Sequence, residues 1–266
     1  MTLPVARLVA EVRSRNPLVH NITNYVAAPL QANALSAIGA SPIMADEESE
    51  AEEMTGLSDG LLINIGTLNR HTIAAMHLSM RSAHAKGIPI VFDPVGVAAT
   101  ELRRQTALEL LAKHPVSIIR ANAGEIAFLA GQASLSKGVD AGGTPDNPLD
   151  LARSVARRYQ CVVAMTGPTD YITDGERTYA CDNGHPMMSV LVGTGCTLSS
   201  VVTAFAAAHP DQLLEAAAAA LAYYGLCGET AAQTAIGPGS LQTNLLDTLH
   251  TLSEQQIQHG CRLSLP

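Results

Sequence analysis

The feature that most constrains the fold is a series of short, nearly continuous apolar runs, each of which ends in a polar residue or a turn. Residues 60–66, 89–94 and 117–122 are three such runs, and runs of this kind are typical of parallel strands that are buried on both faces of a sheet. Helical stretches separate them at about 69–86 and 100–113, and Gly-Ile-Pro or His-Pro follows each of these helices. The alternation predicts an α/β protein with a mostly parallel central sheet.

The remaining segments extend this pattern in both directions. Further strands are predicted at residues 17–22, 41–44 and 161–167, and a hairpin that turns at Gly175 is predicted from residues 171–175 and 178–182. Further helices are predicted at residues 4–15 and 26–39 and, in the alanine-rich C-terminal part, at about 196–208, 211–235 and 238–257. We therefore expect antiparallel edge strands in the sheet and three C-terminal helices over one of its faces.

The composition narrows the class of protein. With 266 residues, of which 47% are hydrophobic and 15% charged, the chain can build one substantial core, so we expect a single domain over residues 1–266. The net charge of −8 and the lack of a Lys/Arg block argue against a nucleic-acid partner. No run reaches the ~18 apolar residues of a membrane span, and the N-terminus lacks a signal-peptide pattern. We expect a cytoplasmic protein with no membrane partner.

Cysteine, histidine and acidic spacing give no sign of a dedicated metal cage. The five cysteines include no Cys-x-x-Cys pair, and their odd number suits a reducing compartment. The nine histidines lack metal-ligand spacing, and only His20 and His185, which lie near glycines and strand ends, remain functional candidates. Six carboxylates crowd residues 46–53, but consecutive positions point around a helix, so we expect a solvated helix there.

A glycine turn at residues 193–195 opens the first C-terminal helix. Gly193 and Gly195 allow a tight turn with uncovered N–H groups, and a helix start adds further unpaired N–H groups and a positive dipole end. Cys196 stands at the same point, where this environment favours the thiolate. Such a turn suits group transfer to or from an anion, although Gly-x-Gly with a small buried cysteine is also an ordinary strand-to-helix turn.

Two predicted strand ends carry charged or polar residues. Asp93 and residues 120–122 fall at the carboxyl ends of strands, where open α/β sheets place their ligand crevice. Glu125 follows in the first turn of a helix, where an acidic side chain commonly does no more than complement the dipole. Residues 132–147, rich in Gly, Ser, Asp and Pro, predict a long mobile surface loop without a catalytic signal.

Taken together and in order, seven segments resemble the hydroxyethylthiazole kinase family of the ribokinase-like superfamily. The seven segments are residues 20–26, 39–44, 64–68, 93–96, 120–125, 166–167 and 193–196. The fourth reads Asp93-Pro94-Val95-Gly96 and the last reads Gly193-Thr194-Gly195-Cys196. Related vitamin kinases have Asp in place of Cys196, so the set is specific although no one motif is decisive. The resemblance implies a ribokinase-like three-layer α/β/α fold.

The resemblance also implies a reaction and a set of roles. The reaction is the ATP-dependent phosphorylation of the primary alcohol of 4-methyl-5-(2-hydroxyethyl)thiazole in thiamine salvage, with Mg²⁺ required. Arg120, Thr166 and Gly195 would bind ATP, and Cys196 would occupy the position of the catalytic base. Met44, Gly193, Asn24 and Val26 would contact the thiazole, and Asp93 and Glu125 would act around Mg²⁺, partly through water or phosphate.

The family resemblance further implies a homotrimer with active sites between subunits, in which the Asn24–Val26 region and Met44 of one subunit reach Cys196 of its neighbour. Two departures from the family pattern concern loops rather than these residues. Val97-Ala98-Ala99 replaces a usual further glycine after Gly96, and Val190-Leu191-Val192 replaces a common polar or basic residue before the final turn. They affect the expected loop conformation and nucleotide affinity, not the type of reaction.

Three other functions remain open at the level of sequence. A nucleotide-dependent repair dehydratase has the same fold and also holds phosphates with a glycine turn, although Cys196 and residues 20–26 disfavour it. A nucleotide- or thiazole-binding protein without catalysis is the second, because a fold does not fix a function. A dinucleotide-binding oxidoreductase is the third, but no Gly-x-Gly-x-x-Gly opens the first helix.

Overall fold

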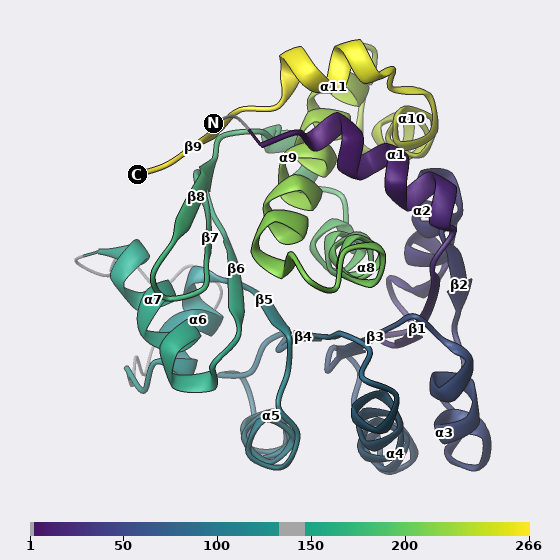
Figure 1. The fold of residues 1–266 in the computed structure, drawn as a ribbon, viewed down its shortest axis with the longest axis vertical. Coiled ribbons are helices and arrows are strands. Elements are labelled where there is room, and N and C mark those ends of the chain that lie inside the picture. The colour runs from purple at the N-terminus through teal and green to yellow at the C-terminus, as the bar shows by residue number, and fades with distance from the viewer. Residues whose placement is uncertain (1–2, 133–146) are drawn as a thin grey trace.

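The computed structural model describes residues 3–132 and 147–266. Within these residues one mixed sheet of nine strands runs in the order β2-β1-β3-β4-β5-β6-β7-β8-β9 (Figure 1). Neighbouring strands from β2 to β6 are parallel, and the pairs β6–β7, β7–β8 and β8–β9 are antiparallel. The strands are β1 (Leu18–Ile22), β2 (Ser41–Ile43), β3 (Gly60–Asn64), β4 (Ile90–Asp93), β5 (Ile118–Asn122), β6 (Val162–Thr166), β7 (Asp170–Thr173), β8 (Thr178–Cys181) and β9 (Leu263–Ser264).

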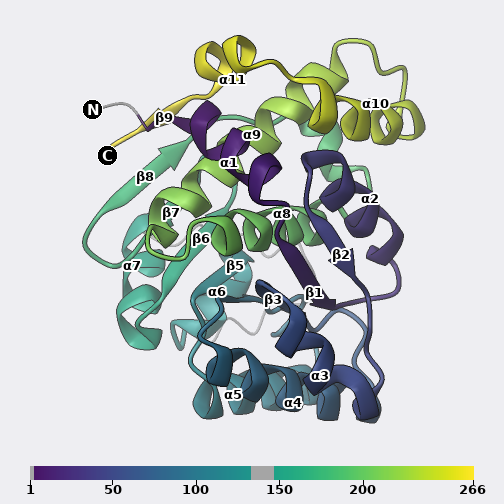
Figure 2. The same cartoon turned by 45° about the vertical axis from the view of Figure 1, so that its right-hand side comes forward.

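Helices cover both faces of this sheet and complete a three-layer α/β/α arrangement (Figures 1 and 2). One face carries α3 (Glu48–Leu57), α4 (Arg70–Lys86), α5 (Glu101–Lys113), α6 (Ala123–Leu129) and α7 (Pro148–Tyr159). The other carries α1 (Val5–Arg15), α2 (Ala28–Ile38), α8 (Thr194–Ala208), α9 (Leu213–Ala232), α10 (Pro238–Thr251) and α11 (Glu254–Gly260). A short 3-10 helix, η1 (Pro186–Ser189), precedes α8. The predicted fold class is confirmed.

Alternation along the central strands explains their apolar composition. Leu62 on β3 packs into the core beneath α8 and α9, whereas its neighbours Leu61 and Ile63 pack into the core on the opposite face. Successive side chains of a strand point to opposite faces, so a strand covered on both sides is apolar at every position. The continuous runs in the sequence follow directly from this double burial.

Small residues allow α8 and α9 to lie directly on the sheet. The run Ala216–Ala220 in α9 is fully buried, and Gly60 on β3 faces α8 so closely that an added Cβ would lie 3.0 Å from Cβ of Ala207. Alanine is the best helix former and covers little of the backbone, so these helices are stable and approach the strands closely. The predicted layer of C-terminal helices is confirmed, and it brings the start of α8 to the edge of the sheet.

The C-terminal part departs from its prediction in two places. The single helix predicted over 238–257 is wrong, because α10 ends at Thr251 and Ser253 caps a new helix by accepting a hydrogen bond from the N–H of Gln256. The antiparallel strand β9, which pairs with β8, was not predicted, because two residues are too few to carry a pattern. The long loop predicted over 132–147 lies almost entirely outside the described residues.

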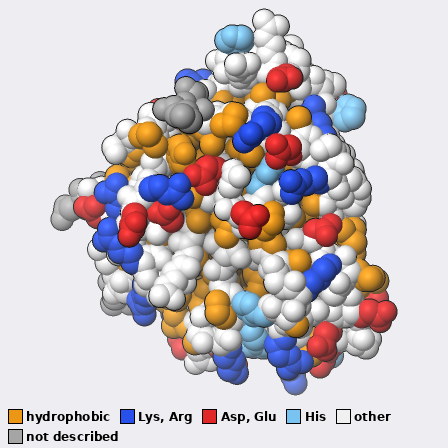
Figure 3. Space-filling view, viewed as in Figure 1, with side chains coloured by type: hydrophobic (Ala, Val, Ile, Leu, Met, Phe, Trp, Pro, Cys, Tyr) orange, Lys and Arg blue, Asp and Glu red, His pale blue; other side chains and the backbone are white. Residues whose placement is uncertain are grey.

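The surface carries no single dominant charge on the face drawn in Figure 3, where acidic and basic side chains are interspersed. The acidic run forms the start of α3, with the Glu47 carboxylate capping the N–H of Ser49, as predicted for a solvated helix. Across the described residues, no group of three or more His, Cys, Asp or Glu side chains is arranged to hold a metal ion. None of the helices in the same residues has the length and apolar character needed to cross a membrane.

We predict that Gly60→Val destabilises the fold. Its side chain would push against Ala207 and Thr203 of α8, and overpacking of this kind costs about 1–3 kcal/mol. Gly239→Ala is a matched control, because a Cβ there meets nothing within 4 Å and the change favours the helix. Chemical denaturation measures both variants, and a Gly60→Val protein with wild-type free energy of unfolding contradicts the packing described here.

Candidate active site

The parallel register brings the polar strand ends to one edge of the sheet. Asn64 at the end of β3 lies opposite Asp93 at the end of β4, and β5 and β6 end side by side with Thr166 opposite Asn122. Asp93 is fully buried. Its Oδ2 accepts hydrogen bonds from Asn64 Nδ2 at 2.8 Å and from Ser199 Oγ of α8 at 2.7 Å. The carboxylate therefore joins two strands to the helix that crosses above them.

Arg120 is the cation of this edge. Its Nη1 lies 4.0 Å from Asp93 Oδ2, and its Nη2 donates a hydrogen bond to Thr166 Oγ1 at 2.8 Å. It also lies against the start of α8, since a Cβ on Gly195 would come 2.8 Å from Arg120 Nη1. Burial raises the pKa of Asp93, and the Arg120 guanidinium partly offsets that rise. The glycine at 195 thus leaves room for the guanidinium.

The start of α8 presents free backbone donors beside this cation. Gly193, with φ of 91°, is the N-cap residue and supplies no side-chain cap, and the first helical bond runs from Thr197 N–H to Gly193 O at 2.8 Å. In the described part of the chain, the N–H groups of Gly195 and Cys196 therefore have no protein acceptor. Unpaired N–H groups at a helix N-terminus next to an arginine form a strong anion site.

Cys196 lies between this anion site and Asn24. Asn24 Nδ2 approaches Cys196 Sγ at 3.2 Å and donates to Asn64 Oδ1 at 3.0 Å. The expected bias of Cys196 toward thiolate is wrong, because burial, and then the nearby Asp93 carboxylate, raise the pKa of its thiol. The hydrogen bond from Asn24 and the charge of Arg120 lower the pKa without outweighing these two effects, so the thiol form is favoured near neutral pH.

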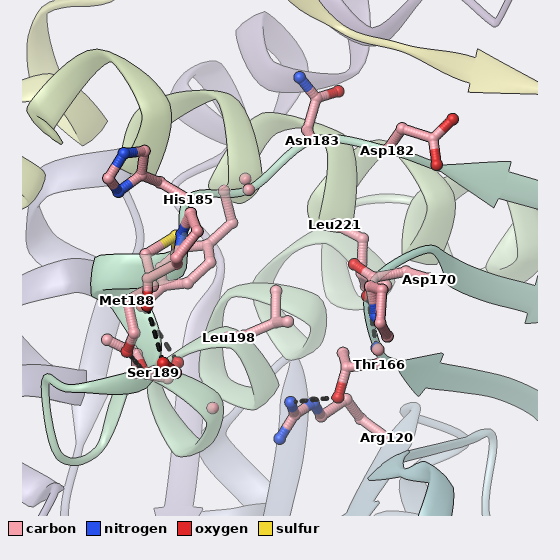
Figure 4. A pocket seen from close by; sticks show the side chains of 18 residues that line it. Arg120, Thr166, Asp170, Asp182, Asn183, His185, Met188, Ser189, Leu198 and Leu221 are labelled. Carbon is pink, nitrogen blue, oxygen red and sulfur yellow. Dashed lines mark hydrogen bonds between the residues drawn. The ribbon is translucent and has the colours of Figure 1, made fainter. Parts of the chain in front are cut away.

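A cavity of about 560 Å³ opens beside the start of α8. Figure 4 shows Arg120 and Thr166 at one end and Asp182 and Asn183 at the other, with His185 and Met188 facing Asp170 across it. The lining residues are Arg120, Thr166, Gly167, Pro168, Asp170, Asp182, Asn183, Gly184, His185, Pro186, Met188, Ser189, Thr194, Gly195, Leu198, Leu221, Tyr224 and Gly225. This volume suits a ligand of nucleotide size.

The two predicted carboxylates have different surroundings. Both oxygens of Glu125 are engaged, Oε1 by the N–H of Gly96 at 2.8 Å and Oε2 by the N–H of Asn122 at 2.9 Å. Burial, and then the charge of Asp93, raise the pKa of Glu125. Asp93 Oδ1, in contrast, is buried and has no hydrogen-bond partner among the described residues. Asp93 is thus the carboxylate with an oxygen to offer a ligand.

The residues expected to contact the thiazole do not all meet within one chain. Met44 lines a second, smaller cavity of about 140 Å³ together with Tyr25 and Asp46, and none of its lining residues lines the larger cavity. Val26 is 55% exposed. The expectation that Asn24 reaches Cys196 of a neighbouring subunit is wrong, because Asn24 contacts Cys196 of its own chain. Gly193 is part of the same turn as Cys196.

Both histidine candidates have local hydrogen-bond partners. His20 is buried, with Nδ1 2.8 Å from Thr55 Oγ1 and Nε2 donating to the carbonyl of Ala45 at 2.7 Å. His185 lines the larger cavity, and its Nδ1 accepts from the N–H of Met187. His20 is therefore a packing residue, whereas His185 belongs to the cavity wall.

Sequence reasoning missed several residues of the site, namely Asn64, Asp170, Ser199 and Tyr224. Asn64 carried a usable signal, because it ends a predicted strand as Asp93 does. Ser199 and Tyr224 lie inside helices, where a polar residue gives no hint of the strand end it meets. Asp170, whose pKa burial raises to about 6, opens the antiparallel strand β7.

The comparisons with known proteins agree with one another. The model of the "Hydroxyethylthiazole kinase family" matches residues 9–255. Hydroxyethylthiazole kinase of Moorella thermoacetica is 45% identical over 261 residues, which cover 98% of this chain and 97% of that protein. The structure of hydroxyethylthiazole kinase from Pyrococcus horikoshii OT3 matches with a TM-score of 0.90 at 38% identity and covers 98% of both chains.

A more distant structure shares the fold alone. A ribokinase-like superfamily protein from Enterococcus faecalis V583 matches with a TM-score of 0.63 at 14% identity, over 89% of this chain and 88% of that one. The family model and the Moorella thermoacetica relative, in contrast, match this chain in sequence over the segments that form the site. The chain therefore belongs to the hydroxyethylthiazole kinase family.

Proposed function

We propose that this protein transfers the γ-phosphoryl group of ATP to the hydroxyl of 4-methyl-5-(2-hydroxyethyl)thiazole. A bond forms between the alcohol oxygen and the γ-phosphorus, the bond to the β,γ-bridging oxygen breaks, ADP leaves, and the alcohol proton passes to the site or to solvent. The observation that carries the proposal is the pair of free N–H groups at Gly195 and Cys196, next to Arg120 and at one end of a nucleotide-sized cavity. The family supports the choice of alcohol.

Arg120, Thr166 and Gly195 hold the phosphates of ATP in this proposal. Phosphoryl transfer proceeds through a loose transition state that gains from positioning and from neutralisation of spreading charge. A guanidinium fixed by Thr166 and Asp93 is already oriented before substrate arrives, so little reorganisation is needed during the reaction. The backbone donors of α8 would contact the same oxygens.

Cys196 accepts the alcohol proton in this proposal. The raised pKa keeps Cys196 mostly as a thiol in the resting protein, so only its small thiolate fraction can take the proton, but the alcohol keeps its proton until late in a loose transition state. By that stage the proton is acidic enough for a modest acceptor. Asn24, which contacts Cys196 Sγ, would hold the acceptor in line with the alcohol.

Asp93 and Glu125 have different parts around Mg²⁺ in this proposal. The orphaned Oδ1 of Asp93 fits a hard cation that takes few protein ligands and keeps much of its water. Glu125, whose oxygens already accept from Gly96 and Asn122, would act through water or by holding that backbone in place. When bound, Mg²⁺ would supply positive charge that neutralises the phosphates.

The thiazole site is completed by a second subunit in this proposal. Met44 and Cys196 belong to different surroundings within one chain, and a homotrimer would join them. Tyr25, Val26, Val190 and Val192 are exposed apolar side chains, 55% to 79% accessible, close in sequence to Asn24 and Gly193. Apolar residues clustered around a site support an interface there.

We further propose that residues 1–266 act as one domain in the cytoplasm. The single continuous sheet, covered by a core on each face, supports one domain. All five cysteines are free, which suits a reducing compartment. Neither property is needed for the chemistry above.

The test of the function is ADP release from purified protein with Mg²⁺-ATP, with and without hydroxyethylthiazole, followed by the mass of the product. We expect ADP formation that depends on the thiazole, together with a phosphorylated thiazole. Binding of ATP and thiazole with no ADP formed would instead support a binding protein. The repair lyase would be supported if ADP forms only when a hydrated nucleotide replaces the thiazole and loses water.

We predict that Cys196→Asp retains or raises turnover. A carboxylate is the acceptor of related vitamin kinases, and burial beside Asp93 would raise its pKa toward neutrality. Cys196→Ala removes the acceptor and is expected to lower kcat by at least about tenfold. Steady-state kinetics at saturating ATP measures both variants, and equal losses in the two would overturn the assigned role.

We predict that Gly193→Val blocks thiazole binding. Gly193 has a positive φ of 91°, which a valine adopts only under strain, and a Cβ there would lie 3.1 Å from Cβ of Ala27. The KM for the thiazole should rise at least about tenfold, whereas binding of ADP, measured by calorimetry, should persist and show that the variant is folded. An unchanged KM for the thiazole contradicts the assignment.

A further inference from the structure

One wall of the large cavity is a short irregular segment, residues 182–185, between β8 and η1. Asp182, Asn183, Gly184 and His185 all line the cavity, and Figure 4 shows Asp182 and Asn183 at the end remote from Arg120. If the phosphates lie at Arg120, this wall faces the nucleoside part of ATP. Within the described residues the segment belongs to no helix or strand. One backbone hydrogen bond, from the N–H of Asp182 to the carbonyl of Arg262 at 3.2 Å, anchors its start, and side chains hold the rest.

Two residues outside the cavity hold this wall. Glu229 on α9 accepts a hydrogen bond from the N–H of Gly184 at 2.7 Å. Both of its carboxylate oxygens also accept from Nδ2 of Asn183, each at 3.4 Å. Arg262, beside β9, donates through Nη2 to the carbonyl of Asp182 at 2.5 Å. Neither Glu229 nor Arg262 lines the cavity itself.

The two residues are also bound to each other. Arg262 Nη1 and Nη2 reach the two oxygens of Glu229 at 3.0 and 2.5 Å, a bidentate arrangement. The backbone N–H of Arg262 donates to Asn183 Oδ1 at 2.6 Å, and Asn183 Nδ2 donates to the carbonyl of Gly260 at 2.9 Å. Residues far apart in the sequence are thereby joined in one network around Asn183.

The wall packs tightly against α9, with glycines at the points of contact. A Cβ on Gly225 of α9 would lie 2.5 Å from the carbonyl oxygen of Asn183, and one on Gly228 would collide with Met188 Sδ. The wall therefore rests directly on the backbone of α9. A shift of the segment by a fraction of an ångström changes both this contact and the shape of the cavity.

We infer that Glu229 and Arg262 are positioning residues that set the nucleoside wall of the ATP site, and so govern nucleotide affinity rather than the chemical step. The inference rests on the proposed assignment of the cavity to ATP. An exposed ion pair contributes little to global stability, so its bidentate geometry and its bonds to Asp182 and Gly184 point to a local task. Loss of Arg262 would also leave the Glu229 carboxylate without its cation.

The test compares Arg262→Ala, Arg262→Lys and Glu229→Gln with the wild type. Calorimetry with ADP gives Kd, kinetics gives KM and kcat, and thermal unfolding gives Tm. Removing these bonds should raise the Kd for ADP and the KM for ATP about three- to tenfold, with kcat and the KM for the thiazole unchanged within about twofold. Arg262→Lys should recover part of the affinity, because lysine keeps the charge but not the bidentate fork.

A second ion pair on α9 provides the control. Arg177 Nη1 lies 2.7 Å from Glu215 Oε1. The Arg177 side chain is 62% exposed and that of Glu215 20%, and the matching values are 52% for Arg262 and 20% for Glu229. Arg177 and Glu215 do not line the cavity. Arg177→Ala and Glu215→Gln should leave the Kd for ADP unchanged, whatever they do to Tm.

Each outcome bears on the inference. An unchanged Kd for ADP in Arg262→Ala and Glu229→Gln overturns it, and so does equal weakening in the control pair. A wild-type protein that binds ADP but does not phosphorylate the thiazole overturns the proposed function, while the calorimetry still decides the role of Glu229 and Arg262. A wild-type protein that binds no ADP overturns both.

Discussion

The buried pair of Asp93 and Arg120 is the interaction on which the candidate site depends. A carboxylate as deeply buried as Asp93 is costly unless charge and hydrogen bonds compensate it, and here Arg120, Asn64 and Ser199 do so in part, through Oδ2. The compensation also organises the surroundings. Because each partner comes from a different element, the pair fixes β3, β4, β5 and α8 relative to one another.

The same pair explains the small residues nearby. The guanidinium needs space beside the helix start, and Gly195 provides it. The helix start in turn keeps its N–H groups free, because Gly193 offers no capping side chain. A positive site is thus built from one side chain and two backbone groups, held rigid before any ligand arrives. Rigid donors of this kind are what a phosphoryl-transfer transition state requires.

Much of this arrangement could be predicted from the sequence. Double burial makes the parallel strands apolar throughout. The positions of the strands, and of polar residues at their ends such as Asp93, could therefore be predicted from the sequence. What stayed hidden depends on contacts between distant residues. The raised pKa of Cys196 comes from burial and from Asp93, and the network of Asn183, Glu229 and Arg262 joins three separate segments. The break between α10 and α11 depends on a local cap that competes with an otherwise helical pattern.

The most direct test of the account is a crystal structure of the protein with Mg²⁺ and a non-hydrolysable ATP analogue. We expect the terminal phosphate to accept hydrogen bonds from the N–H groups of Gly195 and Cys196 and to lie beside Arg120, with the nucleoside toward Asn183. Phosphates at the Asn183 end of the cavity, or a nucleotide bound outside it, would contradict the account.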